Sequence, residues 1–277
     1  MTHAANLFRK LWKQLAKPTV RLSFDFPFSP LHSLKLYGKS LLYFIVGSLV
    51  PVGLFLLTLR FLPPDSQFAR QVLLVPGAEG LILSVLSLAT FVCGFGLQLN
   101  CMRQAIHKDG RRLRDLISFN LRSLQGSWLK AIGLGAVTFA VALVAEQAMA
   151  LVYTVPSSDP TADFIKTLGG SALYVMAGLA ICGPIMEEII FRGFLFNLLR
   201  SSVAMRFDSA ALATVVAIFG SALIFGLMHM NLPALPFYMA LGAVYAEAYR
   251  RSGTLFVPVI AHVLNNSMIV IGLIANQ

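Results

Sequence analysis

The chain has 277 residues, of which 57% are hydrophobic and only 12% are charged, and its mean hydropathy is +0.75. This composition excludes an ordinary water-soluble globular domain and indicates that lipid is the solvent for most of the chain. The net charge of +10 comes from Lys and Arg residues that flank apolar runs and form no separate polar domain. The charge therefore predicts contact with anionic lipid and argues against nucleic-acid binding.

Seven apolar runs are candidates for membrane helices. A helix needs about 20 apolar residues to cross a hydrocarbon layer of about 30 Å. The runs lie near residues 41–62, 81–99, 131–152, 171–191, 210–230, 234–249 and 254–275, and the sixth is short. We therefore predict an all-α fold, a polytopic transmembrane bundle of about seven helices. The first run is too long for the apolar part of a signal peptide, so we expect it to remain as the first helix.

The distribution of basic residues predicts the orientation of the chain in the membrane. Residues 1–40 and residues 100–130 each carry seven Lys or Arg side chains. Loops that stay in the cytoplasm carry the excess of Lys and Arg, so both segments belong inside. With seven crossings, the N-terminus is expected in the cytoplasm and the C-terminus outside, in the cell (inner) membrane if the chain is bacterial.

Both of these cytoplasmic segments have apolar residues at helical spacing. The first carries Leu7, Leu11 and Leu15, and the second carries Ile117, Leu121, Leu124 and Trp128. We expect both to be amphipathic helices that lie along the membrane surface. Anchoring to anionic lipid is the preferred interpretation, and control of substrate entry is the alternative.

Ionisable residues within apolar runs are the candidates for function, because a charge in a membrane helix is costly unless it is paired or faces a wet cavity. The residues that qualify, together with two polar neighbours, are Glu146, Glu187, Glu188, Arg192, His229, Glu247, His262, Asn265 and Asn266. All but Glu146 lie in the last 91 residues. The chemistry of the chain is therefore expected in its C-terminal part.

The densest group of these residues is Glu187, Glu188 and Arg192. Glu188 and Arg192 are four residues apart, with the carboxylate N-terminal to the cation, which predicts an ion pair on one helix face. Glu187 lies about 100° further round the helix. We expect it to face a cavity, where a carboxylate can take a proton from water. The alternative is a buried packing network with no chemistry.

Two histidines accompany this group. His229 follows Phe225 by four residues and lies near a helix end, where an interfacial or capping role competes with a catalytic one. His262 and Asn266 share a face at a spacing of four residues. They predict either a hydrogen-bonded pair between helices or a donor site.

Together these residues suit amide hydrolysis, which needs a base to activate water and donors for the negative oxygen of the tetrahedral intermediate. The sequence has neither a serine nucleophile elbow nor an HExxH zinc motif, so covalent serine chemistry has little support.

The same residues resemble the CPBP family (CAAX proteases and bacteriocin-processing enzymes, also called Abi-like). Three motifs carry the resemblance in order: Glu187-Glu188 with Arg192, Phe225 with His229, and His262 with Asn266. The segment Tyr249-Arg250-Arg251-Ser252-Gly253 before the last helix adds to it. The resemblance covers roughly residues 169–274. It divides the chain into a basic cytoplasmic segment (1–40), N-terminal membrane helices with a basic loop (41–168) and a protease-like core (169–277).

The resemblance implies an intramembrane endopeptidase that acts on a membrane-associated or lipidated protein or peptide. Glu187 and His229 would activate water, His262 and Asn266 would stabilise the oxyanion, and Glu188 and Arg192 would hold the site together. If zinc is bound, Glu187, His229 and His262 are the ligands to expect. We prefer activation of water without a metal.

Two other classes of function compete with the protease. A non-catalytic immunity or scaffold protein could use the same fold to bind another membrane protein, although it would not need so costly a polar centre. A transporter could use the same residues as a proton relay, but the sequence shows no convincing inverted repeat. The protease remains the leading prediction.

Overall fold

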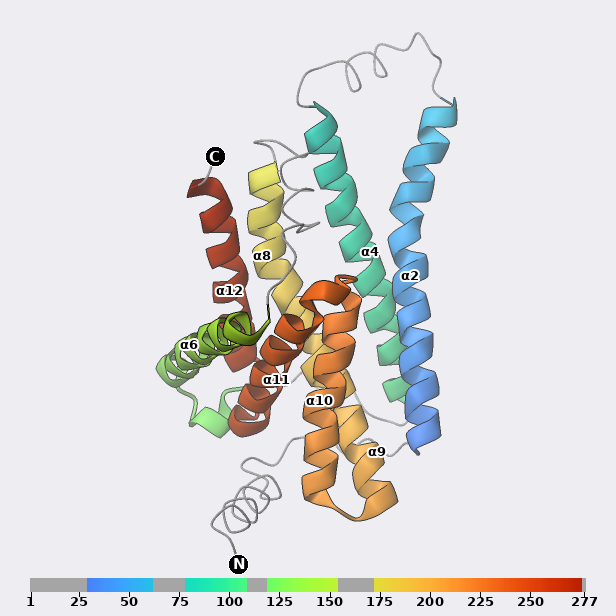
Figure 1. The fold of residues 1–277 in the computed structure, drawn as a ribbon. Coiled ribbons are helices and arrows are strands. Elements are labelled where there is room, and N and C mark those ends of the chain that lie inside the picture. The colour runs from blue at the N-terminus through green and yellow to red at the C-terminus, as the bar shows by residue number, and fades with distance from the viewer. Residues whose placement is uncertain (1–28, 62–77, 109–118, 154–171, 276–277) are drawn as a thin grey trace, which may run out of the picture. The chain divides into compact units, whose positions relative to one another are not determined.

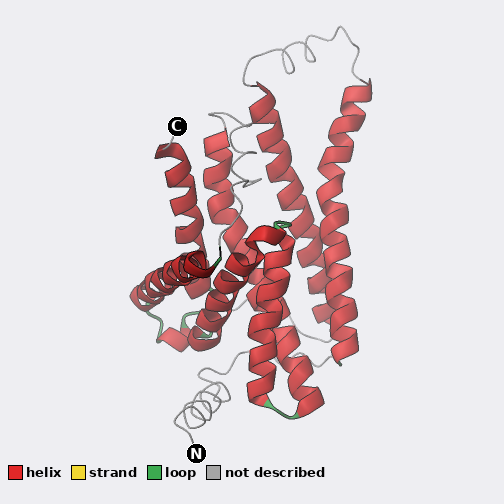
Figure 2. Cartoon of the chain, viewed as in Figure 1, coloured by secondary structure: helices red, strands yellow, loops and turns green. Residues whose placement is uncertain are grey.

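The computed structural model describes residues 29–61, 78–108, 119–153 and 172–275. These residues form helices and connecting turns and include no strand, which confirms the predicted all-α fold (Figure 2). The α-helices, labelled in Figure 1, are α2 (Pro30–Phe61), α4 (Ala78–Lys108), α6 (Trp128–Val152), α8 (Ala172–Glu188), α9 (Asn197–Phe207), α10 (Ala210–Met228), α11 (Leu235–Ser252) and α12 (Phe256–Ala275). Two 3₁₀ turns, η1 (Arg122–Leu124) and η3 (Leu232–Ala234), and a π-helix, η2 (Ile189–Phe196), complete the described elements.

Each of the seven predicted runs overlaps a helix, and four described helices are long and apolar enough to cross a membrane. Their spanning segments are Leu34–Thr58, Val85–Lys108, Trp128–Val152 and Ala210–Met228. A shorter apolar stretch, Phe256–Gly272, lies in α12. Over the described residues, α8 and α11 do not meet the same criterion. The chain is an integral membrane protein.

The first helix begins at Pro30 rather than near residue 41. Pro30 stands at the first helical position, where its missing N–H is not needed, and Ser29 Oγ accepts a hydrogen bond from the backbone N–H of His32 at 3.4 Å. Hydropathy marks only the apolar part of this helix, whereas the capping residues set its start. The first predicted amphipathic segment, around Leu7, lies outside the described residues.

The second predicted amphipathic segment is not one continuous helix over its described part. Gln125 and Gly126 adopt positive φ angles of 57° and 74°, which break the chain between η1 and α6. Ser127 then caps α6, because its side chain accepts from the backbone N–H of Lys130 at 3.3 Å. Leu124 is buried beside Val257 of α12. This apolar residue therefore packs inside the protein, and the expected surface helix is replaced by a turn.

The described helices divide between two compact units. Unit one contains the described residues within Met1–Lys35, Arg111–Pro156 and Ile185–Asn265, and unit two contains those within Leu36–Gly110, Ser157–Pro184 and Asn266–Gln277. In unit two, small residues let α2 and α4 approach closely: a Cβ on Gly47 would lie 2.6 Å from the backbone oxygen of Cys93. Gln98 Nε2 donates to Ser40 Oγ at 3.5 Å in the same contact.

Unit one is built around the hairpin of α9 and α10 and the packing of α10 on α11. Asp208, in the left-handed conformation, ends α9, and Ser209 caps α10 by accepting from the backbone N–H of Leu212. Figure 1 shows the resulting tight connection between the two helices. A Cβ on Gly242 of α11 would lie 2.9 Å from the Cα of Ala222 in α10, so glycine at this position sets how closely the two helices pack.

The fourth predicted run is part of a longer helical stretch. The chain stays helical from Ala172 to Phe207, through α8, the π-helix η2 and α9. The predicted run ends near residue 191, whereas the helical stretch does not. Because it continues to Phe207, Glu187 lies near the middle of the stretch.

Candidate active site

Glu188 is the centre of a buried cluster that joins two helices. Arg192 Nη1 donates to Glu188 Oε1 at 2.9 Å, and both side chains are fully buried. This is the ion pair that the four-residue spacing predicts. His262 Nδ1, from α12, lies 2.9 Å from the same oxygen. The carboxylate therefore links the end of α8 to α12.

Arg192 has further partners in α10 and α11 that offset part of the cost of its buried charge. Its Nη2 donates to the backbone oxygen of Gly242 at 3.0 Å. The guanidinium carbon lies 4.8 Å from the ring centroid of Phe225 and 5.5 Å from that of Tyr245. A buried cation needs such hydrogen bonds and ring contacts to offset its lost hydration.

Arg192 belongs to the π-helix, and a side chain supports the irregular backbone there. A π-helix pairs residues five apart, and such segments often occur at functional sites. Asn197 Nδ2 donates to the backbone oxygen of Gly193 at 2.8 Å and lies 3.2 Å from that of Arg192. The same nitrogen lies 3.0 Å from the hydroxyl of Tyr249 in α11. Asn197 thus ties the π-helix to α11.

His262 lies between the two glutamates. Its Nε2 is 3.8 Å from Glu187 Oε2, while Nδ1 is bonded to Glu188. The ring stacks on Tyr245, with centroids 4.9 Å apart and an angle of 25° between the planes. Because Nδ1 donates to the carboxylate of Glu188, Nε2 can also donate only when the ring carries both protons. The oxyanion role implied by the family resemblance therefore requires the imidazolium form.

His229 ends α10 and its ring is bonded to the helix itself. Its Nδ1 lies 2.8 Å from the backbone oxygen of Phe225. A carbonyl oxygen can only accept, so Nδ1 carries a proton, and in the neutral ring Nε2 is the acceptor that a base requires. The ring also stacks on Tyr238 at 4.1 Å. The capping interpretation and the catalytic one are thus compatible in this geometry.

Phe225 connects the two histidines. Its ring centroid lies 4.7 Å from that of His229 and 5.7 Å from that of His262. His229 lies at the end of α10, as its position near a helix end in the sequence predicted. The structure places it one aromatic ring away from His262. Among the described residues, no hydrogen bond or ion pair joins His229 to Glu187.

Asn266 lies in α12, four residues after His262. It is the first residue of that helix to fall in unit two, whereas the cluster around Glu188 falls in unit one. Its predicted role as an oxyanion donor therefore stays a prediction.

Sequence reasoning missed two neighbours of the cluster. Tyr245 is fully buried against His262; its only signal was the spacing of Gly242, Tyr245 and Tyr249 along one face of the sixth run. Glu146 of α6 hydrogen-bonds to the side chain of Asn265 in α12. Glu146 is one of the ionisable residues within apolar runs, but it lies outside the site that the sequence predicts.

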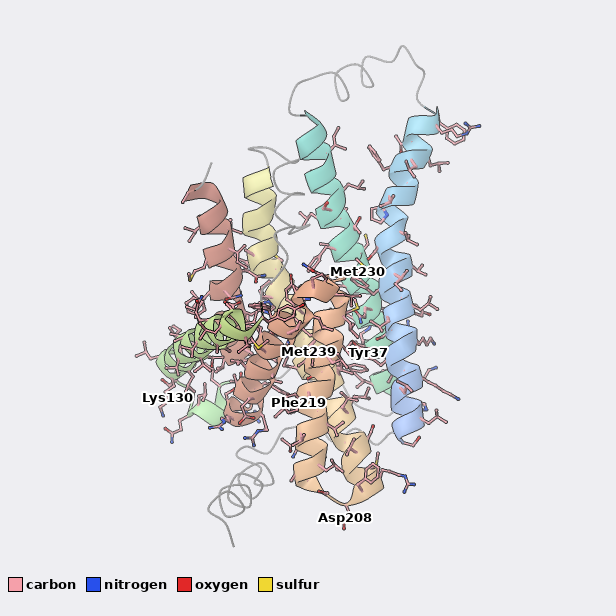
Figure 3. The ribbon with its side chains drawn as sticks, viewed as in Figure 1. Tyr37, Lys130, Asp208, Phe219, Met230 and Met239 are labelled. Carbon is pink, nitrogen blue, oxygen red and sulfur yellow. The ribbon has the colours of Figure 1, made fainter. Side chains whose placement is uncertain are left out.

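Four buried polar atoms around this cluster have no hydrogen-bond partner among the described residues: Glu187 Oε2, Glu188 Oε2, Arg192 Nε and the hydroxyl of Tyr245. Buried polar atoms in proteins are nearly always paired with protein or water. Four unpaired polar atoms on neighbouring side chains therefore mark a place that can receive further polar groups. The side chains of the described residues are drawn in Figure 3.

The predicted zinc ligands do not form a metal site in this arrangement. Over the described residues, no group of three or more His, Cys, Asp or Glu side chains could hold a metal ion. The Nδ1 atoms of His229 and His262 are bonded to Phe225 and Glu188, which leaves Nε2 of each ring as the nitrogen that a metal would use. Zinc sites usually require three or four close protein ligands. The described side chains are therefore not gathered around one metal position, and zinc binding by Glu187, His229 and His262 stays a prediction.

Fold and site together define a helical membrane protein with a buried centre of two glutamates, an arginine and a histidine. Residues 169–268 match the family model described as "Type II CAAX prenyl endopeptidase Rce1-like". The family resemblance predicted from the three motifs is confirmed over this segment.

Two curated proteins are similar to the same part of the chain. One, from Bacillus subtilis (strain 168), is named "Putative membrane peptidase YdiL" and is 38% identical over 114 residues, which cover 41% of this chain and 43% of that protein. The other, from Staphylococcus aureus (strain USA300), is named "Membrane-embedded CAAX protease MroQ" and is 33% identical over 93 residues, covering 34% of this chain and 36% of that protein. The chain thus spans less than half the length of these relatives. No solved structure matches it.

Proposed function

We propose that the protein is an intramembrane endopeptidase that hydrolyses a peptide bond of a membrane-associated or lipidated protein or peptide. The observation that carries the proposal is the set of orphaned polar atoms on Glu187, Glu188, Arg192 and Tyr245. A scaffold has no need for unpaired polar atoms in a buried centre, whereas hydrolysis needs places for water and for the substrate amide. The similarity of residues 169–268 to CAAX endopeptidases supports the same reaction.

In the proposed mechanism, Glu187 accepts a proton from the attacking water. It is the better placed of the two carboxylates, because Glu188 Oε1 is already shared by Arg192 and His262. His229 assists through Nε2, the nitrogen that its bond to Phe225 leaves as an acceptor. Such base catalysis commonly contributes about 10²–10⁴ in rate.

The negative oxygen of the tetrahedral intermediate would be stabilised by His262 and Asn266. Glu188 and Arg192 are positioning residues in this scheme. Glu188 holds the His262 ring through Nδ1, and Arg192 holds Glu188 while bonding to Gly242 in α11. Each oxyanion donor would contribute about 10²–10³ in rate.

The proposal is tested with purified protein in detergent and a library of membrane-proximal peptides, both unmodified and prenylated. We expect cleavage of at least one peptide, and we expect Glu187→Ala and His229→Ala to abolish it without a change in thermal unfolding. Asp208→Asn and His107→Ala are matched controls, because both residues are exposed and lie outside the site. Cleavage that persists in both site variants would refute the assignment.

A cellular test separates the enzyme from the scaffold. Glu187→Gln keeps the shape of the side chain but removes its basicity. If a strain that carries Glu187→Gln retains full function, binding rather than hydrolysis is the activity of the protein. Loss of function with normal expression supports hydrolysis.

A further inference from the structure

A groove lies on the side of α11 away from the catalytic cluster. Gly242, Tyr245 and Tyr249 face the cluster, whereas Val244, Glu247 and Arg251 lie on the opposite face at spacings of three and four residues. The groove has a volume of about 830 Å³ and falls entirely within unit one. That volume is typical of a ligand site.

The walls of the groove are apolar and come from α6 and α10. Leu134, Val137 and Val141 line it from α6, and Ile218 and Phe219 line it from α10. Val137 and Phe219 are 60% and 58% exposed, so the side chains of these walls are accessible to a ligand. Phe219 on α10 is labelled in Figure 3. Such a surface suits a hydrocarbon chain.

One end of the groove carries an exposed cation, Arg251. Arg250 Nε and Nη2 pair with both carboxylate oxygens of Glu247, at 2.6 Å and 2.7 Å. Arg251 shares the same carboxylate through Nε. The side chain of Arg251 is 68% exposed and can reach an anion.

An unsatisfied hydroxyl also belongs to the lining of the groove. Ser123 of η1 lines the groove, and its Oγ is buried with no hydrogen-bond partner among the described residues. A buried hydroxyl is normally paired. It can donate to an oxygen of a headgroup held at Arg251. This observation is independent of the charge, and it points to a polar group of a ligand in the groove.

We propose that the groove binds one anionic phospholipid, with acyl chain along the apolar walls and phosphate between Arg251 and Ser123. The predicted topology supports this, because Arg250 and Arg251 lie at the cytoplasmic end of the predicted sixth helix, where anionic lipid headgroups are found. The site lies on the opposite face of α11 from Tyr245, so it does not depend on the proposed catalytic function.

Native mass spectrometry of delipidated protein in detergent tests the proposal. Phosphatidylglycerol and phosphatidylcholine with identical acyl chains are titrated separately. We expect phosphatidylglycerol to bind with saturation at one per chain and more tightly than phosphatidylcholine. Arg251→Ala should weaken phosphatidylglycerol about five-fold, the loss expected for one surface cation, and Arg251→Lys should largely restore it. Arg206→Ala, at an exposed residue of α9, is the charge control.

A second pair of variants tests the apolar part of the groove. Thr138→Trp should fill it and abolish saturable binding of either lipid, and Val137→Phe serves if the tryptophan variant does not fold. Val144→Trp, on an exposed position of α6 outside the lining, should bind like the unmodified protein.

Four outcomes would overturn the proposal. The first is equal binding of the two phospholipids, and the second is binding that Arg251→Ala and the groove-filling variants leave unchanged. The third is uptake of an isoprenoid alcohol in preference to phosphatidylglycerol. Binding that rises without saturation would identify an annular lipid only and would overturn it equally.

Discussion

At the scale of single residues, Arg192 is a fully buried cation on which several contacts depend. Arg192→Ala would leave Glu188 buried without its cation and would remove the bond to Gly242. Breaking one side of a buried ion pair typically costs about 3–5 kcal/mol. We expect a large fall in the thermal unfolding temperature in detergent. The unfolding temperature of Arg192→Lys should lie between those of Arg192→Ala and the unmodified protein. A lysine keeps the positive charge but cannot make both guanidinium contacts.

The control for this prediction is Arg206→Ala, which removes an exposed arginine from α9. Its unfolding temperature should stay within experimental error of the unmodified protein. An equal loss in both variants would mean that the effect of Arg192 comes from net charge rather than from the buried pair.

The role of Asn266 and the question of metal are decided by one set of measurements. If Asn266 donates to the oxyanion, Asn266→Ala should slow cleavage by about 10²–10³. Metal content, measured by elemental analysis of purified protein, should be the same in the variant and the unmodified chain. Zinc near one per chain that is lost together with activity, and restored with it, would contradict the proposed metal-free mechanism. Loss of a bound metal in Asn266→Ala would place Asn266 in a metal site.

At the scale of helices, the contact between α10 and α11 depends on Gly242. An added Cβ there would lie 2.9 Å from the backbone Cα of Ala222, so Gly242→Ala must push the two helices apart. Overpacking of this kind commonly costs about 1–3 kcal/mol. Because Arg192 bonds to the oxygen of Gly242, we also expect cleavage to fall. Thermal unfolding and peptide cleavage measure the two effects.

Gly133→Ala is the matched control within α6, since nothing lies within 4 Å of the added Cβ. Replacing an open helical glycine with alanine should be neutral or slightly stabilising, by about 0.5–1 kcal/mol. Destabilisation of both variants to the same extent would show that close packing at Gly242 is not the cause.

At the scale of the whole molecule, the distribution of Lys and Arg predicts a cytoplasmic N-terminus and an external C-terminus. Phosphatase and fluorescent-protein reporters, each fused to either end, would check this in cells. We expect fluorescence only from the N-terminal fusion and phosphatase activity only from the C-terminal one. Both ends on the same side would mean an even number of crossings, and α11, which is too polar to qualify by composition alone, would be the first helix to reconsider.

Much of the fold could be predicted from the sequence because lipid imposes simple requirements on length and polarity. All seven runs overlap helices, yet the boundaries differ where capping decides them: α2 begins at Pro30, and the chain remains helical beyond residue 191 to Phe207. The described part of the predicted surface helix around Leu121 is a turn instead, because Gln125 and Gly126 take positive φ angles that hydropathy does not reveal.

The sequence by itself determined the membrane class, the helical fold and the pairing of Glu188 with Arg192, since these follow from composition and from a four-residue spacing within one helix. Only the tertiary structure decided that Glu188 also holds His262, 74 residues away, and that Arg192 reaches the backbone of Gly242, 50 residues away. The tertiary structure alone also decided the stacking of Tyr245 on His262 and the groove on the opposite face of α11. The physical reason is that contacts between helices depend on how closely small residues let them approach and which faces they present, and neither is encoded in the spacing along one helix.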